Sequence, residues 1–73
     1  MSPQTPSSIV AVDRYLNSVF GGVERLAGVI RGIPVVTFRR TATEQEYILG
    51  GAEIAVNRDP IQIAKAIRDH WEA

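Results

Sequence analysis

Few residues of this chain belong to the types that carry out catalysis. His70 is the single histidine and the chain has no cysteine, so disulfides and thiolate–zinc sites are excluded. A hydrolase triad would have to join His70 to Ser7, Ser8 or Ser18, and nothing in their spacing suggests such a relay. We interpret His70 as a surface residue near the C-terminal end of a helix.

Three carboxylates offer the other possible source of chemistry. Glu44, Glu46 and Glu53 could converge across a hairpin and bind a magnesium ion. No loop of the kind that holds a nucleotide phosphate accompanies them, because the glycine pairs at 21–22 and 50–51 lack the required spacing. We interpret these carboxylates as a solvated surface, and we predict a protein that is not an enzyme and needs no metal or cofactor.

Arginine is the residue type best suited to a binding role in this chain. The pair Arg39-Arg40 ends the strongest β-forming run, residues 33–40, in which residues 35–38 are expected to be core. Neighbours on a strand point to opposite faces, so one guanidinium can stack over the sheet while the other reaches solvent. Arginine is enriched at protein interfaces, although the pair could instead protect an edge strand from aggregation. The candidate protein-binding residues are Arg25, Arg31, Arg39 and Arg40.

The charge of the chain is zero overall but unevenly distributed. Residues 1–43 hold five arginines and two acidic residues, a net charge of +3, whereas residues 44–73 hold three basic and six acidic residues, a net charge of −3. A dipolar chain suits a complementary protein surface better than a uniformly anionic duplex. The two halves could equally attract each other within the fold.

A first helix is expected near the amino terminus. Ser7 or Ser8 can cap a helix that runs to about Phe20, because its apolar residues recur at helical spacing. These residues are Ile9, Val12, Tyr15, Leu16, Val19 and Phe20. The glycine pair at 21–22 ends this helix.

A second helix is predicted over residues 22–31. Its apolar residues are Val23, Leu26, Ala27 and Ile30, and Gly32 is placed to act as a left-handed stop. Gly28 in the middle costs about 1 kcal/mol relative to alanine in a helix. The alternative interpretation is a short strand over residues 28–31 that turns at Gly32.

The middle of the chain favours a hairpin. Residues 47–49 and 52–56 are typical of two strands, and the glycine pair at 50–51 supplies the positive φ values that a tight turn requires. The alternative uses the capping-box pattern of residues 43–46, which would make residues 44–49 one helical turn.

The last helix has the clearest signals. Asp59 is a good N-cap and Pro60 suits the first helical position. The apolar residues Ile63, Ala64, Ile67 and Trp71 form a stripe at helical spacing.

The fold class that follows is α+β, with two N-terminal helices, a small antiparallel sheet of two or three strands and a C-terminal helix. Residues 1–8 are predicted to be a mobile tail, and residues 9–73 a single small domain. At 73 residues the domain has a thin core, so helices must cover one face of the sheet.

In size, dipolar charge, lack of cysteine and Ser/Pro-rich lead, the chain resembles the small regulators that bacteriophages use to redirect host machinery. The resemblance implies a non-enzymatic protein that binds and modulates or inhibits a larger protein, with host RNA polymerase as the leading partner. No signal peptide or membrane span is evident, which predicts a cytoplasmic protein, in the host cytoplasm if it is phage-encoded.

Two alternatives belong to other classes. The two N-terminal helices could form a DNA-binding helix-turn-helix whose arginines contact phosphates, although a pI of about 6.5 gives no excess of positive charge. A subunit of a virion or another assembly would also fit the expected fold.

Overall fold

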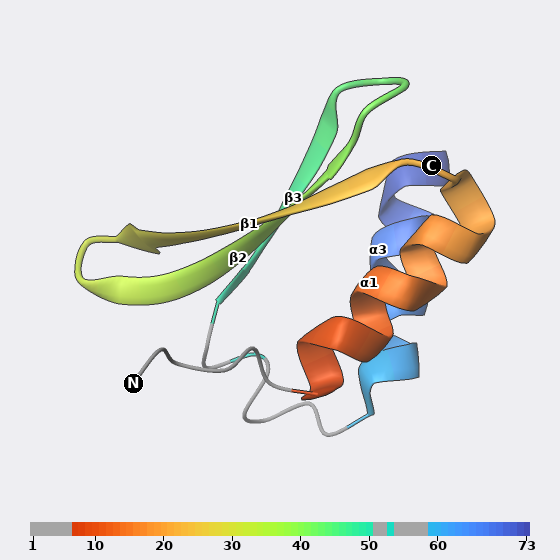
Figure 1. The fold of residues 1–73 in the computed structure, drawn as a ribbon. Helices are drawn as coiled ribbons and strands as arrows, with labels where there is room; N and C mark the ends of the chain where they lie inside the picture. The colour runs from red at the N-terminus through yellow and green to blue at the C-terminus, as the bar shows by residue number, and fades with distance from the viewer. Residues whose placement is uncertain (1–6, 51–52, 54–58) are drawn as a thin grey trace.

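The computed structural model describes residues 7–50, 53 and 59–73 of the chain. Two helices, α1 (Ser7–Phe20) and α3 (Pro60–Glu72), flank a sheet of three strands, β1 (Val23–Ile30), β2 (Ile33–Arg40) and β3 (Gln45–Gly50). The sheet is antiparallel with strand order β1-β2-β3. Both helices lie on one face of it, and the β1–β2 hairpin projects away from them (Figure 1). The α+β class and the covered sheet face are therefore confirmed.

Helix α1 forms as its apolar spacing predicts, and Gly21 ends it. Ile9, Val12 and Leu16 are buried, whereas Val19, expected on the same stripe, is exposed. The Gly21 N–H donates to the Asn17 carbonyl at 2.8 Å while Gly21 has a φ of +65°. Glycine adopts this left-handed conformation without the clash that a side chain would introduce, which is why the helix stops there.

The predicted second helix over residues 22–31 is wrong, because these residues form strand β1 and its turn. Ile30 pairs with Ile33 around Arg31 and Gly32, whose φ values of +51° and +80° are those of a type I′ turn. The alternative strand interpretation is confirmed for residues 28–30, although Arg31 belongs to the turn, and the strand extends back to Val23. A helix-turn-helix in this region is excluded, since its second helix does not exist.

Strands β2 and β3 pair from Val35↔Gly50 to Arg40↔Gln45. Pro34 pairs with Val29 of β1 and lies one residue beyond the end of the β2–β3 pairing. The missing N–H of proline therefore removes no hydrogen bond from the sheet. Residues 45–50 are a strand, which confirms the strand interpretation over the helical turn. The strand expected at 52–56 lies outside the described residues except for Glu53, which is helical and exposed. The predicted mobile tail also lies outside them, apart from Ser7 and Ser8 in α1.

Helix α3 begins as predicted. The Asp59 carboxylate accepts a hydrogen bond from the Ile61 N–H at 3.0 Å, and Pro60 occupies the first turn. The guanidinium of Arg68 donates to the Tyr15 hydroxyl at 2.8 Å, which ties α3 to α1. Asp69, which accepts from the same guanidinium, raises the pKa of Arg68.

The core lies between the two helices and the adjoining sheet face. It consists of Ile9, Val12, Leu16, Val23, Phe38, Leu49, Ile63, Ala64, Ile67 and Trp71. Of the four residues expected to be core at 35–38, only Phe38 is fully buried, because Val35 and Thr37 point to the other face. No helix in the described part of the chain is long and apolar enough to cross a membrane.

Candidate functional site

The candidate arginines Arg39 and Arg40 point to opposite faces of the sheet, as neighbours on a strand should. Arg40 pairs with Val23 on one side and Gln45 on the other, and the buried Val23 identifies this as the helix-covered face. The Arg40 guanidinium lies 4.3 Å from the centroid of the Phe20 ring, a cation–π contact with the last residue of α1. Arg40 is therefore part of the packing between sheet and helix.

Gln45 extends this contact to the second helix. The Arg40 guanidinium donates to the Gln45 side-chain oxygen at 3.3 Å, and the Gln45 amide donates to the Trp71 carbonyl at 2.9 Å. The Trp71 ring in turn meets the Phe20 ring edge-on, with centroids 5.6 Å apart. These four side chains join the ends of both helices to the sheet, which leaves Arg40 little freedom to contact a partner.

Replacing each arginine in turn tests whether Arg40, but not Arg39, contributes to the stability of the domain. Arg40→Gln is expected to destabilise the domain by about 1 kcal/mol, because it removes a partly buried cation–π contact. Arg39→Gln should stay within about 0.5 kcal/mol, as is usual for an exposed ion pair. Urea unfolding followed by circular dichroism measures both, and equal midpoints for the two variants would contradict the structural role of Arg40.

Arg39 belongs to a row of alternating charges on the face that the helices do not cover. Glu24, Arg39 and Glu46 are cross-strand neighbours on β1, β2 and β3. The Arg39 guanidinium lies 3.8 Å from the Glu24 carboxylate and 3.3 Å from that of Glu44. The ion pair between Arg39 and Glu44 therefore links the basic half of the chain, residues 1–43, to the acidic half, residues 44–73.

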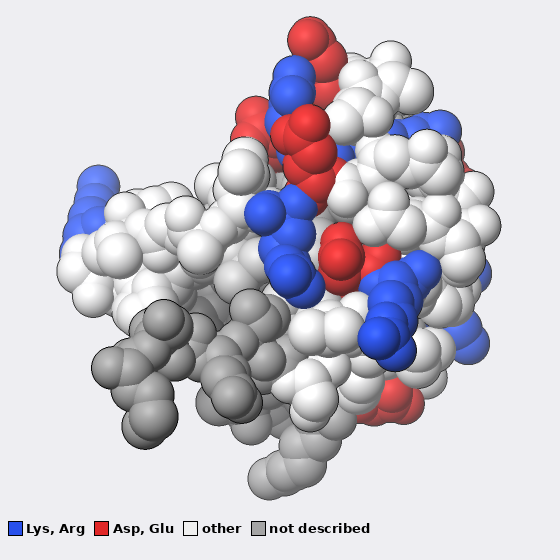
Figure 2. Space-filling view, in the orientation of Figure 1, with Lys and Arg blue, Asp and Glu red and all other residues white. Residues whose placement is uncertain are grey.

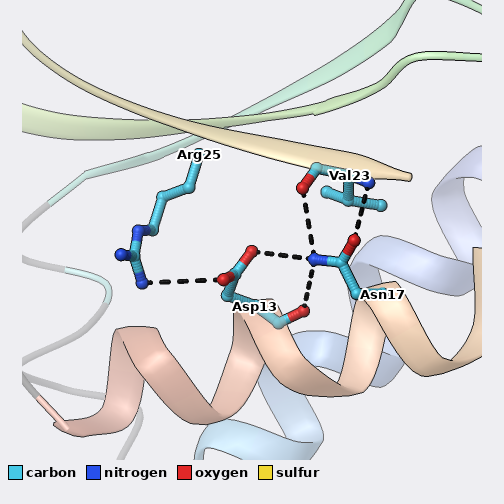
Figure 3. A network of polar contacts seen from close by, with 4 residues as sticks. All are labelled: Asp13, Asn17, Val23 and Arg25. Atoms are coloured by element: carbon cyan, nitrogen blue, oxygen red, sulfur yellow. Dashed lines mark hydrogen bonds and ion pairs between the residues drawn. The ribbon is translucent and has the colours of Figure 1, made fainter. Parts of the chain in front are cut away.

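Arg25 lies on the helix-covered side, in a polar network at the start of β1 (Figure 3). Its guanidinium is 3.7 Å from the Asp13 carboxylate, and Asp13 accepts a hydrogen bond from the Asn17 amide at 3.0 Å. The Asn17 side chain also accepts from the Val23 N–H at 2.9 Å and donates to the Val23 carbonyl at 3.1 Å. Asn17 thus binds the backbone of β1 as a neighbouring strand residue would.

Arg31 is placed at the tip of the hairpin, in the turn between β1 and β2. Figure 2 shows that the hairpin end of the molecule is mostly uncharged, whereas acidic and basic groups lie next to one another on the rest of the face in view. The four arginines therefore occupy separate places and do not form a single basic patch. Among them, Arg39 and Arg31 are the ones that face solvent without a packing role.

The uncovered face of the sheet carries apolar residues that the sequence analysis did not assign to a site. Leu26 and Ile48 flank Thr37 in one cross-strand row and are 52% and 50% exposed. Ile30 and Ile33 form a second exposed apolar pair, 46% and 56% exposed. The half-buried Val35, opposite Gly28, lies between the two rows on the same face. We call these residues, Leu26, Ile30, Ile33, Thr37 and Ile48, the open face.

A signal for the open face was present in the sequence. The dipeptide Arg31-Gly32 sits between Ile30 and Ile33, and a two-residue link between β-branched residues is typical of a hairpin. Once β1 is a strand, Leu26 and Ile30 share the face opposite to the buried Val23.

The other residues with possible chemistry do not form a site. In the described ranges, no group of three or more His, Asp or Glu side chains could hold a metal ion, so Glu44, Glu46 and Glu53 do not converge. His70 packs edge-on against the Tyr47 ring, with centroids 5.4 Å apart. No protein-family model, curated protein or solved structure matches this chain.

Proposed function

We propose that this chain is a non-enzymatic regulatory domain that binds a larger protein through the open face of its sheet. The observation that carries the proposal is the group of four half-exposed aliphatic side chains on that face, Leu26, Ile30, Ile33 and Ile48. Single exposed apolar residues are ordinary, but a contiguous group rimmed by polar residues is typical of a protein-binding surface.

The charged row beside the open face supports the same function. Glu24, Arg39 and Glu46 border the apolar residues along one side. An apolar centre with a charged rim is the usual anatomy of a transient protein interface, in which the rim steers the encounter and limits the choice of partner. Arg39, one of the four candidate arginines, is part of this rim.

Bacterial RNA polymerase is the first partner to test, because the chain resembles phage regulators of host transcription in size and charge distribution. The test uses immobilised wild-type protein and the double variant Ile33→Lys/Ile48→Lys with bacterial lysate and with purified polymerase. We expect the wild type to retain one large partner and the variant to bind it at least about 100-fold more weakly, since losing two anchors costs about 2.8 kcal/mol or more.

A matched control adds the same charges to the helical side of the molecule. Val19 on α1 and Ile61 on α3 are also exposed, so Val19→Lys/Ile61→Lys should bind the partner as the wild type does. Equal retention by the open-face variant and the wild type would rule out the open face as the binding surface. A bait that retains nothing at micromolar concentration would count against the regulatory function itself.

A further inference from the structure

The free edge of the sheet at β1 has a defined hydrogen-bonding pattern. Ile30 and Ile33 close a two-residue type I′ turn, so they exchange backbone hydrogen bonds. Bonding alternates along an antiparallel pair, which directs the N–H and C=O of every second β1 residue away from β2. These outward residues are Val23, Arg25, Ala27 and Val29.

Asn17 occupies the first outward position. Its side-chain amide binds both the N–H and the C=O of Val23, at 2.9 and 3.1 Å, as Figure 3 shows. In the described part of the chain, no backbone or side-chain group makes the corresponding bonds to Arg25, Ala27 or Val29. The free edge is therefore three outward residues long, and it begins at Arg25.

Beyond Arg25, this edge lacks the features that usually prevent strand addition. β1 contains no proline and no lysine, and after Arg25 its residues are Leu26, Ala27, Gly28, Val29 and Ile30. All of them are exposed. An edge that is apolar and exposed over this length is a template for another strand.

We propose that β1 pairs with β1 of a second copy of this chain, antiparallel and with Ala27 opposite Ala27. Only this register uses all three free positions, because it sets Arg25 against Val29, Ala27 against Ala27 and Val29 against Arg25. Each of these pairs exchanges two backbone hydrogen bonds. The product is a continuous six-stranded sheet with the helices of both copies on the same face.

The side chains fit this register. Leu26 lies opposite Gly28 of the second copy, where the missing side chain leaves room for the exposed leucine. Nothing within one copy requires glycine there, since a Cβ at Gly28 would make only an ordinary contact, 3.9 Å from Val35 Cγ2, and its φ is not positive. Glycine weakens a strand within a single chain, and the proposed pairing gives a reason for its presence at position 28.

Charge also disfavours the neighbouring registers of the same pair of strands. Moving the centre to Arg25 would set Arg25 against itself, and moving it to Gly28 would set Arg25 against Arg31. Like charges directly opposite each other destabilise a sheet, so both shifts are disfavoured.

The proposal is tested by sedimentation equilibrium of the full chain at concentrations from roughly 1 μM to 1 mM. We expect a monomer–dimer equilibrium in the wild type. Ala27→Pro should weaken it at least about 10-fold, because proline removes an outward N–H without removing a β1–β2 bond. A wild type that stays monomeric throughout, or a proline variant that dimerises equally well, would overturn the proposal.

A further variant keeps the test independent of folding. Gly28→Val should raise or preserve the thermal midpoint at low concentration while it weakens the dimer, as valine favours a strand but fills the space for Leu26. Unchanged dimerisation in Gly28→Val would reject the register.

Hydrogen exchange distinguishes the second copy from other occupants of the edge. The amides of Arg25, Ala27 and Val29 should become protected as concentration rises. Protection that is the same at all concentrations would mean that the edge is covered within a single chain, and would overturn the proposal. Ile48→Lys, which alters the open face away from β1, should leave dimerisation unchanged even if it abolishes partner binding.

Discussion

Replacing Phe38 by alanine is expected to destabilise the domain by about 3–5 kcal/mol. The ring is fully buried at the centre of the sheet, between Arg25 on β1 and Tyr47 on β3. A domain of this length has a total stability of about 4–11 kcal/mol, so the variant should lose a large part of it and unfold at a much lower urea concentration. Urea unfolding followed by the fluorescence of Trp71, the single tryptophan, measures the loss.

The neighbouring residue provides the control for Phe38→Ala. Thr37 lies on the same strand but on the uncovered face, so Thr37→Val should change the unfolding free energy by no more than about 0.5 kcal/mol. If Phe38→Ala unfolded at the same urea concentration as Thr37→Val, the assignment of the core to the helix-covered face would be wrong.

Asn17→Ala is expected to cost about 2–3 kcal/mol, an unusually large effect for a polar residue on a helix. Truncation leaves the N–H and C=O of Val23 without their partner, and a buried polar group left unpaired costs about 1–3 kcal/mol. Val23 itself is buried, so water replaces the lost amide poorly. Thermal unfolding by circular dichroism measures the destabilisation, and hydrogen exchange of the Val23 amide reports the contact directly.

Asn17→Ala should also lengthen the free edge of β1 by one outward residue. We therefore expect the variant to pair in more than one register and to aggregate more readily than the wild type. Ser18→Ala, at the next position and exposed, serves as the control and should change neither property. A Val23 amide that stays protected in Asn17→Ala would show that Asn17 does not hold the edge.

The terminal helices could be predicted from the sequence because their signals are local. Asp59 and Pro60 mark the start of α3, and its apolar residues at positions 63, 64, 67 and 71 have the helical period. The helix predicted over residues 22–31 is wrong because the apolar residues of β1 match that period as well, namely Val23, Leu26, Ala27 and Ile30. The usual alternation of a half-buried strand is absent, since only Val23 in β1 is buried.

The candidate site was less predictable, because it depends on contacts between distant parts of the chain. That Arg39 and Arg40 face opposite sides follows from strand geometry. That Arg40 is held against Phe20 depends on how α1 packs on the sheet, which no local pattern encodes. The open face exists because both helices cover the same side of the sheet, and this arrangement also depends on tertiary packing.

The position of the two helices at opposite ends of the described chain has a consequence for synthesis. α1 packs against α3, but about 40 residues separate them, so the core cannot close until α3 has left the ribosome. Until then the apolar stripe of α1 and the hairpin, a local element that forms within microseconds, are exposed together. The nascent chain should therefore be most prone to chaperone binding and misassembly just before α3 emerges.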